Sequence, residues 1–229
     1  MKPIHLTSGD EGKTMPKADS LYIDIGASDK EDALKYVNLG DRAVICSEYT
    51  ETEDKIKAKA LDDRVGCANL IRLIKEYDEY DFYATFTVQE ETALPAIGGL
   101  VLANAIQPDA AIAIDVCQTA DTPDAPQMDT WLGKGASILV RDTTLIADKA
   151  LTDDMVAAAK EAGIPYQLLV ALEGGTDAVP MQQAGRGCRV NVLSVPMKYL
   201  HTSAEMADLA DAENVLDLTV LLCNRPFSF

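Results

Sequence analysis

The sequence predicts an α/β protein whose mixed, mostly parallel sheet is covered by helices on both faces. Three observations support this prediction. From residue 81 onward, short apolar runs typical of strands alternate with amphipathic runs typical of helices. The run Ala110–Val116 is almost entirely apolar, as expected of a strand covered on both faces. Apolar residues make up 48% of the 229 positions, which is enough for a sizeable core.

The elements follow in order along the chain. Apolar residues at helical spacing predict a helix over Asp63–Tyr77, and an aromatic and β-branched run predicts a strand over Asp81–Val88. Further strands are predicted over Ala110–Val116, Ser137–Val140, Tyr166–Ala171 and Arg189–Val195. Further helices are predicted over Ile97–Ala105, over Asp153–Ala162 with Gly163 as its C-cap, after Gly174–Ala178, and over Ala212–Cys223.

Residues 1–56 lack this alternation. The segments Leu21–Ser28 and Arg42–Ser47 are predicted as short strands joined by turns. We therefore predict a small β-rich unit over residues 1–56 and a main α/β domain over residues 57–229.

The charge balance excludes several classes of protein. Lysine and arginine total 20 against 37 aspartate and glutamate residues, a net charge of −17 that repels nucleic-acid phosphates and anionic lipids. No apolar run approaches the roughly 20 residues that span a bilayer, and the first residues lack the pattern of a signal peptide. We expect a cytoplasmic protein with no nucleic-acid and no membrane partner.

The five cysteines have no metal-binding or disulfide spacing, so we expect reduced, structural thiols. They are Cys46, Cys67, Cys117, Cys188 and Cys223.

Acidic side chains and one histidine gather where predicted strands end, which is the edge where ligands bind in open α/β sheets. These residues are Asp62, Asp63, Glu90, Glu91, Asp115 and His201. Carboxylates brought together raise one another's pKa unless a cation neutralises them. Mixed oxygen and nitrogen ligands suit zinc, cobalt or manganese, and a pair of such ions can activate a water. The alternative is that these acids are solvated strand ends, with Asp62 and Asp63 capping a helix.

Seven short segments occur in an order that matches a known family. They are KALDDRVG (Lys59–Gly66), TVQEE (Thr87–Glu91), AIDV (Ala113–Val116), ADTPD (Ala120–Asp124), LGKG (Leu132–Gly135), GGTDA (Gly174–Ala178) and SVPMKYLHTSAEM (Ser194–Met206). The chain closely resembles the tetrahedral aminopeptidases, a cytoplasmic dinuclear metallopeptidase family that includes glutamyl and deblocking aminopeptidases. The resemblance implies a zinc-aminopeptidase-like fold and peptide substrates.

The resemblance also implies a role for each site residue. Asp62 would bridge two divalent ions, with Glu91 and His201 completing one metal site and Asp115 serving the other. Glu90 would be the general base.

The same resemblance implies a cis peptide between Asp62 and Asp63. The segment GGTDA would border the substrate cleft and supply the substrate-binding residues Gly174, Gly175, Thr176 and Asp177. From the residues alone, this segment can equally be a turn that caps the helix after it.

Residues 1–56 resemble the later part of an inserted oligomerisation domain through which family members assemble from dimers into dodecamers. A homo-oligomer is therefore implied, up to a dodecamer where that domain is complete.

One family feature has no counterpart in this sequence. The first metal histidine of the family lies in a His-x-Asp segment upstream of the inserted domain. Of the two histidines here, His5 matches the inserted domain and is interpreted as a surface or turn residue. The catalytic domain is expected to lack its early strands, and the second ion to keep only Asp62 and Asp115. We therefore expect two ions in a complete family site and one or none in this chain.

Three functions remain open at this point. The first is a metal-dependent aminopeptidase that removes N-terminal residues from short peptides. The second is a catalytically silent subunit or remnant that acts in assembly or peptide binding. The third is a dinuclear hydrolase for acylated amino acids or C-terminal peptide bonds.

Overall fold

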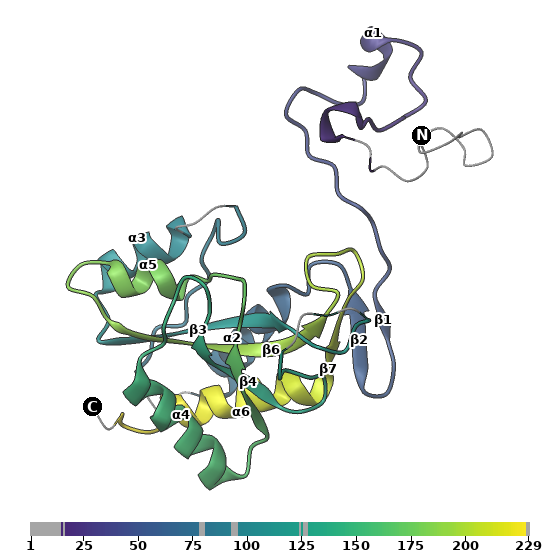
Figure 1. The fold of residues 1–229 in the computed structure, drawn as a ribbon. Helices are drawn as coiled ribbons and strands as arrows, with labels where there is room; N and C mark the ends of the chain where they lie inside the picture. The colour runs from purple at the N-terminus through teal and green to yellow at the C-terminus, as the bar shows by residue number, and fades with distance from the viewer. Residues whose placement is uncertain are drawn as a thin grey trace. The chain divides into compact units, whose positions relative to one another are not determined.

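The computed structural model describes residues 15, 17–77, 81–92, 96–123, 125 and 128–227. Contacts divide the chain into two compact units, Met1–Val44 and Ile45–Phe229. All described strands belong to the larger unit (Figure 1).

The described part of the smaller unit contains a 3-10 turn, Ala18–Ser20, and one short helix, α1 (Lys30–Ala33). Asp29 caps α1 by accepting a hydrogen bond from the backbone N–H of Asp32 at 2.9 Å. The strands predicted at Leu21–Ser28 and Arg42–Ser47 are wrong: no described segment forms a backbone ladder with either one. The assignment of residues 1–56 to a separate β-rich domain stays a prediction.

The larger unit is built on a seven-stranded mixed sheet in the order β1-β2-β7-β6-β4-β5, with β3 paired to β6 (Figure 1). The strands are β1 (Thr50–Glu51), β2 (Lys55–Ala58), β3 (Ala110–Gln118), β4 (Ala136–Arg141), β5 (Tyr166–Val170), β6 (Arg189–Lys198) and β7 (Glu205–Asp208). The central strand β6 pairs with β3 along one edge and with β4 and then β7 along the other. The sheet is mixed, as predicted: the long pairs β3/β6 and β4/β5 are parallel, and the shorter described pairs are antiparallel.

Helices cover both faces of this sheet, as the sequence predicts. They are α2 (Arg64–Glu76), α3 (Ile97–Ile106), α4 (Lys149–Ala162), α5 (Ala178–Gln183) and α6 (Leu209–Cys223). Successive residues of β6 point to opposite faces. Val190 and Val192 pack in a core with α3 and α5, whereas Leu193 and Val195 pack in a core with α2, α4 and α6. Figure 1 shows α3 and α5 on one side of the sheet and α4 and α6 on the other. None of the described helices has the length and apolar character to cross a membrane.

Most elements agree with the sequence predictions, but the strand predicted over Asp81–Val88 is wrong. The backbone of residues 81–87 makes no hydrogen bond to any other described segment, and a strand requires such a ladder. Strands β2 and β7 were not predicted, because each has only four residues and their sequences, KIKA and EMAD, contain too few apolar residues to show a pattern.

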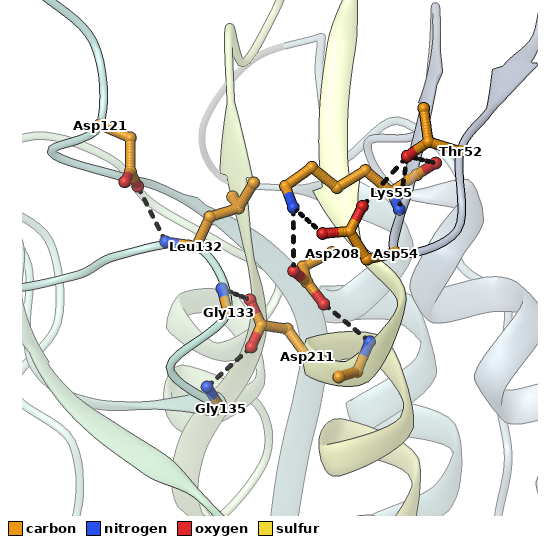
Figure 2. A network of polar contacts seen from close by, with 10 residues as sticks. Thr52, Asp54, Lys55, Asp121, Leu132, Gly133, Gly135, Asp208 and Asp211 are labelled. Carbon is orange, nitrogen blue, oxygen red and sulfur yellow. Dashed lines mark hydrogen bonds and ion pairs between the residues drawn. The ribbon is translucent and has the colours of Figure 1, made fainter.

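The first turn of α6 anchors a neighbouring loop and strand (Figure 2). The fully buried carboxylate of Asp211 accepts hydrogen bonds from the backbone N–H groups of Gly133 and Gly135, both at 2.7 Å. Asp208 caps the helix and lies 3.6 Å from the Nζ of Lys55 on β2. The family segment Leu132–Gly135 therefore has a structural role in this chain.

Candidate metal centre

Three side chains from distant segments meet at one end of the sheet. Asp62 lies just before α2, Glu91 lies between residues 81–88 and α3, and His201 lies in the turn between β6 and β7. One ligand atom from each lies within 4.8 Å of the other two. His201 Nε2 is 3.0 Å from Asp62 Oδ2 and 3.5 Å from Glu91 Oε2. The structure therefore brings these three residues together, and their role as metal ligands stays a prediction.

The start of α2 separates the roles of the two adjacent aspartates. Asp63 caps the helix by accepting a hydrogen bond from the N–H of Gly66 at 3.0 Å. A Cβ on residue 66 would lie 2.4 Å from Asp63 Oδ2, so this cap requires glycine. The helix-cap interpretation therefore applies to Asp63, and the side chain of Asp62 lines the cavity. The peptide bond between them is cis, as the resemblance implies.

A buried carboxylate that the sequence analysis missed holds two of these segments together. Glu205, at the start of β7, is 2% exposed. Its Oε2 accepts the N–H of Asp62 at 3.1 Å, and its Oε1 accepts the N–H of His201 at 3.0 Å. The available signal was its position in the segment Ser194–Met206, four residues after His201. Glu205 contacts backbone rather than ligand atoms and is therefore a positioning residue.

A cavity of about 420 Å³ surrounds the site. The predicted residues that line it are Asp62, Glu90, Glu91, Asp115, Gly174, Gly175, Thr176 and His201. The fourth predicted substrate-binding residue, Asp177, does not line it. Asp177 is buried and accepts a hydrogen bond from the hydroxyl of Thr87 instead. Thr176 Oγ1 accepts the N–H of Ala178 at 3.1 Å, so part of this segment also forms the turn before α5.

Burial and mutual repulsion raise the pKa of Asp62, Asp63, Glu90 and Asp115. Burial is the main cause that raises the pKa of Asp62 to about 8, and the neighbouring carboxylate of Glu91 adds to the shift. Burial raises the pKa of Asp63 and of Glu90 to about 7, and Glu91 adds to the shift at Glu90. Burial is also the main cause that raises the pKa of Asp115, and the negative charge of Asp63 adds to it. Such shifts mark a site where negative charge lacks a counterion.

The residues that line the cavity fit a divalent ion. None of the described lining residues is lysine or arginine, so no side chain there balances the carboxylates. Two carboxylates and one imidazole are ligands that zinc and cobalt accept. The nearby Cys117 is not suited as a thiolate ligand, because burial raises the pKa of its thiol to about 12.

The structure supplies fewer ligands for a second ion. Asp115, in the second half of β3, lines the same cavity but lies outside the three-ligand group. Its Oδ1 accepts the N–H of Val116 at 2.7 Å. The other histidine, His5, lies outside the described residues. Among the described residues, a second ion would therefore have Asp62 and Asp115.

Among solved structures, this fold is that of aminopeptidases. An aminopeptidase from the archaeon Desulfurococcus kamchatkensis superposes with a TM-score of 0.90 at 33% identity, over 99% of this chain and 64% of that one. The TET1 peptidase of Pyrococcus horikoshii, which can assemble into a tetrahedron or a large octahedral shell, gives a TM-score of 0.85 at 34% identity, over 100% of this chain and 67% of that one.

The chain itself belongs to the M42 glutamyl aminopeptidase family, whose sequence model matches residues 1–218. A protein of Acetivibrio thermocellus named as an aminopeptidase is 39% identical over 87% of this chain and 61% of its own length. The lysyl aminopeptidase of Pyrococcus furiosus is 31% identical over 92% of this chain and 62% of its own length. The chain therefore spans about three fifths of the length of these curated relatives.

Proposed function

We propose that this chain forms the metal-binding part of an aminopeptidase that removes N-terminal residues from short peptides. One observation supports the proposal most directly: the ligand atoms of Asp62, Glu91 and His201 lie within 4.8 Å of one another. They do so in a member of the M42 family that is similar to a protein named lysyl aminopeptidase.

Asp62, Glu91 and His201 would hold the ion, for which we propose zinc or cobalt, with manganese as a further option. When bound, a divalent ion polarises the scissile carbonyl and lowers the pKa of water. Glu90 is the general base in this proposal. Glu90 is the neighbour of the proposed ligand Glu91 in the sequence and lines the same cavity. It can therefore accept a proton from the attacking water and deliver it to the leaving amine.

The cavity also suits the positive end of a peptide. Its described lining includes the carboxylates of Asp115 and Glu173 and no lysine or arginine. This charge favours the ammonium group of a peptide N-terminus. Gly174 and Gly175 have no side chains, so a substrate backbone can approach them closely.

A second ion belongs to the proposed complete enzyme. Asp62 would be shared between the two ions, with Asp115 on the second. The described residues supply no third ligand there, so we expect this chain alone to bind one ion tightly and the second weakly.

Metal titration of the full chain tests the site. Calorimetric titration with Zn²⁺ should show one tight site, and the substitution His201→Ala should abolish it. The matched control is His5→Ala, which removes the other histidine and should leave binding unchanged. Equal binding by the wild-type chain and His201→Ala would refute the metal centre.

Activity tests the general base. Glu90→Gln should lower kcat for aminoacyl-nitroanilides by about 10²–10⁴-fold, with Zn²⁺ binding unchanged. The control, Glu161→Gln, changes an exposed acid that pairs with Arg225 on the surface and should be fully active. A metal-loaded chain that binds peptides without cleaving them would instead support a silent subunit.

We also propose a cytoplasmic homo-oligomer. The described part of the smaller unit exposes several large apolar side chains, among them Tyr22 at 75%, Ile23 at 70% and Leu39 at 95%. Large apolar groups exposed together are typical of surfaces covered by a partner. All five cysteines are free, in agreement with a reducing compartment. Light scattering should give a mass of at least a dimer, and Leu39→Lys should lower it; a monomer would refute the oligomer.

A further inference from the structure

An aspartate at the start of α5 does not cap its own helix. Asp177 directly precedes α5, the position from which an aspartate side chain usually accepts an N–H group of the first turn. Its side chain accepts no such bond from the described residues of α5, and the hydroxyl of Thr176 accepts the N–H of Ala178 instead, at 3.1 Å. The buried carboxylate of Asp177 accepts the hydroxyl of Thr87, 90 residues earlier in the chain. A local bond is thus replaced by a distant one.

The same carboxylate faces the first turn of α3, which lies beside α5 (Figure 1). A Cβ on residue 99 would lie 2.8 Å from Asp177 Oδ1, so an alanine in place of Gly99 would displace the carboxylate. The residue before α3 is Ala96, whose side chain cannot accept a hydrogen bond from the helix. The negative charge of Asp177 therefore lies at the positive end of α3, where it is stabilised.

The residue after Thr87 is held by α3 as well. The N–H of Gly98, in the first turn of the helix, donates to the carbonyl of Val88 at 3.1 Å. A Cβ on residue 98 would lie 2.4 Å from that carbonyl oxygen, so this bond requires glycine. Apart from the contacts of Glu91 at the metal centre, these two bonds are the only ones that join described residues 81–92 to another described segment. The position of the segment therefore depends on them.

This segment carries two residues of the proposed site. Glu90 and Glu91 follow Thr87 by three and four residues. On the other side of the bond, Gly174–Thr176 line the cavity around the metal centre and lead directly into Asp177. The hydrogen bond between Thr87 and Asp177 therefore joins two walls of that cavity.

We infer that Asp177 is a positioning residue, which holds Glu91 at the metal centre through its hydrogen bond with Thr87. This role rests on the proposed function and adds a residue to it. Asp177 is not among the described residues that line the cavity, so it acts through the segment and not on the ion or the substrate. Without the bond, the segment would become ordered only when the ion binds, and this loss of conformational freedom would lower the affinity for the ion.

Two substitutions at residue 87 test the inference by calorimetric titration of the full chain with Zn²⁺. Thr87→Val keeps the shape of the side chain but removes the hydroxyl donor, and it should lower the affinity for Zn²⁺ by about 10–100-fold. Thr87→Ser keeps the donor and should bind like the wild-type chain. The matched control is Thr219→Val, the same change in α6, where the hydroxyl donates to the carbonyl of Val215. This control should also bind like the wild-type chain.

The background Glu91→Gln separates positioning from a general loss of structure. In this variant Asp62 and His201 remain as ligands, so Zn²⁺ should bind more weakly. If Thr87 acts through Glu91, adding Thr87→Val to this background should cause no further loss of affinity. A substitution that only loosens the fold would lower the affinity in both backgrounds alike.

Hydrogen exchange measures release of the segment without any metal. Because the N–H of Gly98 donates to Val88, exchange of this amide reports whether the segment stays against α3. In the metal-free chain, Thr87→Val should speed this exchange at least about tenfold. Unchanged exchange in β6 should show that the variant is folded.

Four results would overturn the inference. They are unchanged Zn²⁺ affinity in Thr87→Val, an equal loss of affinity in the wild-type and Glu91→Gln backgrounds, a Thr87→Ser variant as weak as Thr87→Val, and unchanged exchange at Gly98. A wild-type chain that binds Zn²⁺ through His201, together with a Thr87→Val variant that binds it equally well, would refute the positioning role alone. A wild-type chain that binds no Zn²⁺ would refute the metal centre and the positioning role with it.

Discussion

Replacing Glu205 with glutamine should destabilise the chain, because this carboxylate joins two segments that are distant in the sequence. It is 2% exposed and accepts N–H groups from Asp62 and His201 at 3.1 and 3.0 Å. The amide of glutamine has one oxygen, so one of the two N–H groups would face an NH₂ group and lose its acceptor. Leaving a buried donor unsatisfied costs about 1–3 kcal/mol, and the remaining bond loses its charge assistance.

A competing effect acts in the opposite direction but is smaller. The charge of Glu205 contributes to the raised pKa of Asp62, so its removal relieves some repulsion. This contribution ranks last among the causes of that shift, after burial and the neighbours Glu91 and Asp63. We therefore expect the free energy of unfolding to fall by about 2–3 kcal/mol.

Urea denaturation of the metal-free full chain measures this loss as a lower midpoint with an unchanged slope. The matched control is Glu213→Gln, because Glu213 is an exposed acid that pairs with Arg72. Surface pairs contribute about 0–1 kcal/mol, so the control should lose less. Zn²⁺ affinity should also fall by about 10–100-fold in Glu205→Gln. Equal stability of the two variants would refute the positioning role.

Two further predictions concern pH and backbone geometry. The pKa values of Asp62 and Asp63 are raised from 3.8 to about 8 and about 7 in the folded, metal-free chain. At pH values between 3.8 and these raised values, the folded chain therefore binds more protons than the unfolded chain. Its thermal midpoint should therefore rise as the pH falls from 8 to about 5, and Asp62→Asn should weaken this dependence; a midpoint that falls over this range would contradict the raised pKa values. Gly135→Ala should lower the free energy of unfolding by roughly 2–4 kcal/mol in urea, because φ is +97° and a Cβ would lie 2.2 Å from the backbone of Pro165. Gly163→Ala, with φ +69° and nothing within 4 Å of its Cβ, is the control and should cost only about 1–2 kcal/mol; similar losses in both variants would show that the contact with Pro165 is unimportant.

The sequence predicted those elements whose signal is local. Helical periodicity located α2, and the apolar run Ala110–Val116 located β3. The predictions failed where a strand depends on a distant partner. β2 and β7 pair with each other across about 150 residues, and nothing in KIKA or EMAD indicates that partner. The segment Asp81–Val88 shows the reverse case, a strand sequence with no ladder in the described chain.

The site was predictable mainly through the family segments. Acids at strand ends alone left solvated residues as an alternative, and the ordered segments pointed to Asp62, Glu91 and His201. Glu205 lies in the family segment Ser194–Met206, but only the geometry shows its role, because accepting backbone N–H groups leaves no pattern in the sequence. The same holds for Asp177, which contacts Thr87 rather than the cavity.

The central position of β6 has a consequence for synthesis on the ribosome. β3 ends at Gln118, and its pairing partner does not begin until Arg189. At usual translation speeds of about 5–20 residues per second, the apolar strand β3 remains unpaired for roughly 4–14 s. Nascent chains are open to aggregation during that interval. Slow induction, which keeps few nascent chains present at once, should therefore increase the yield of folded protein.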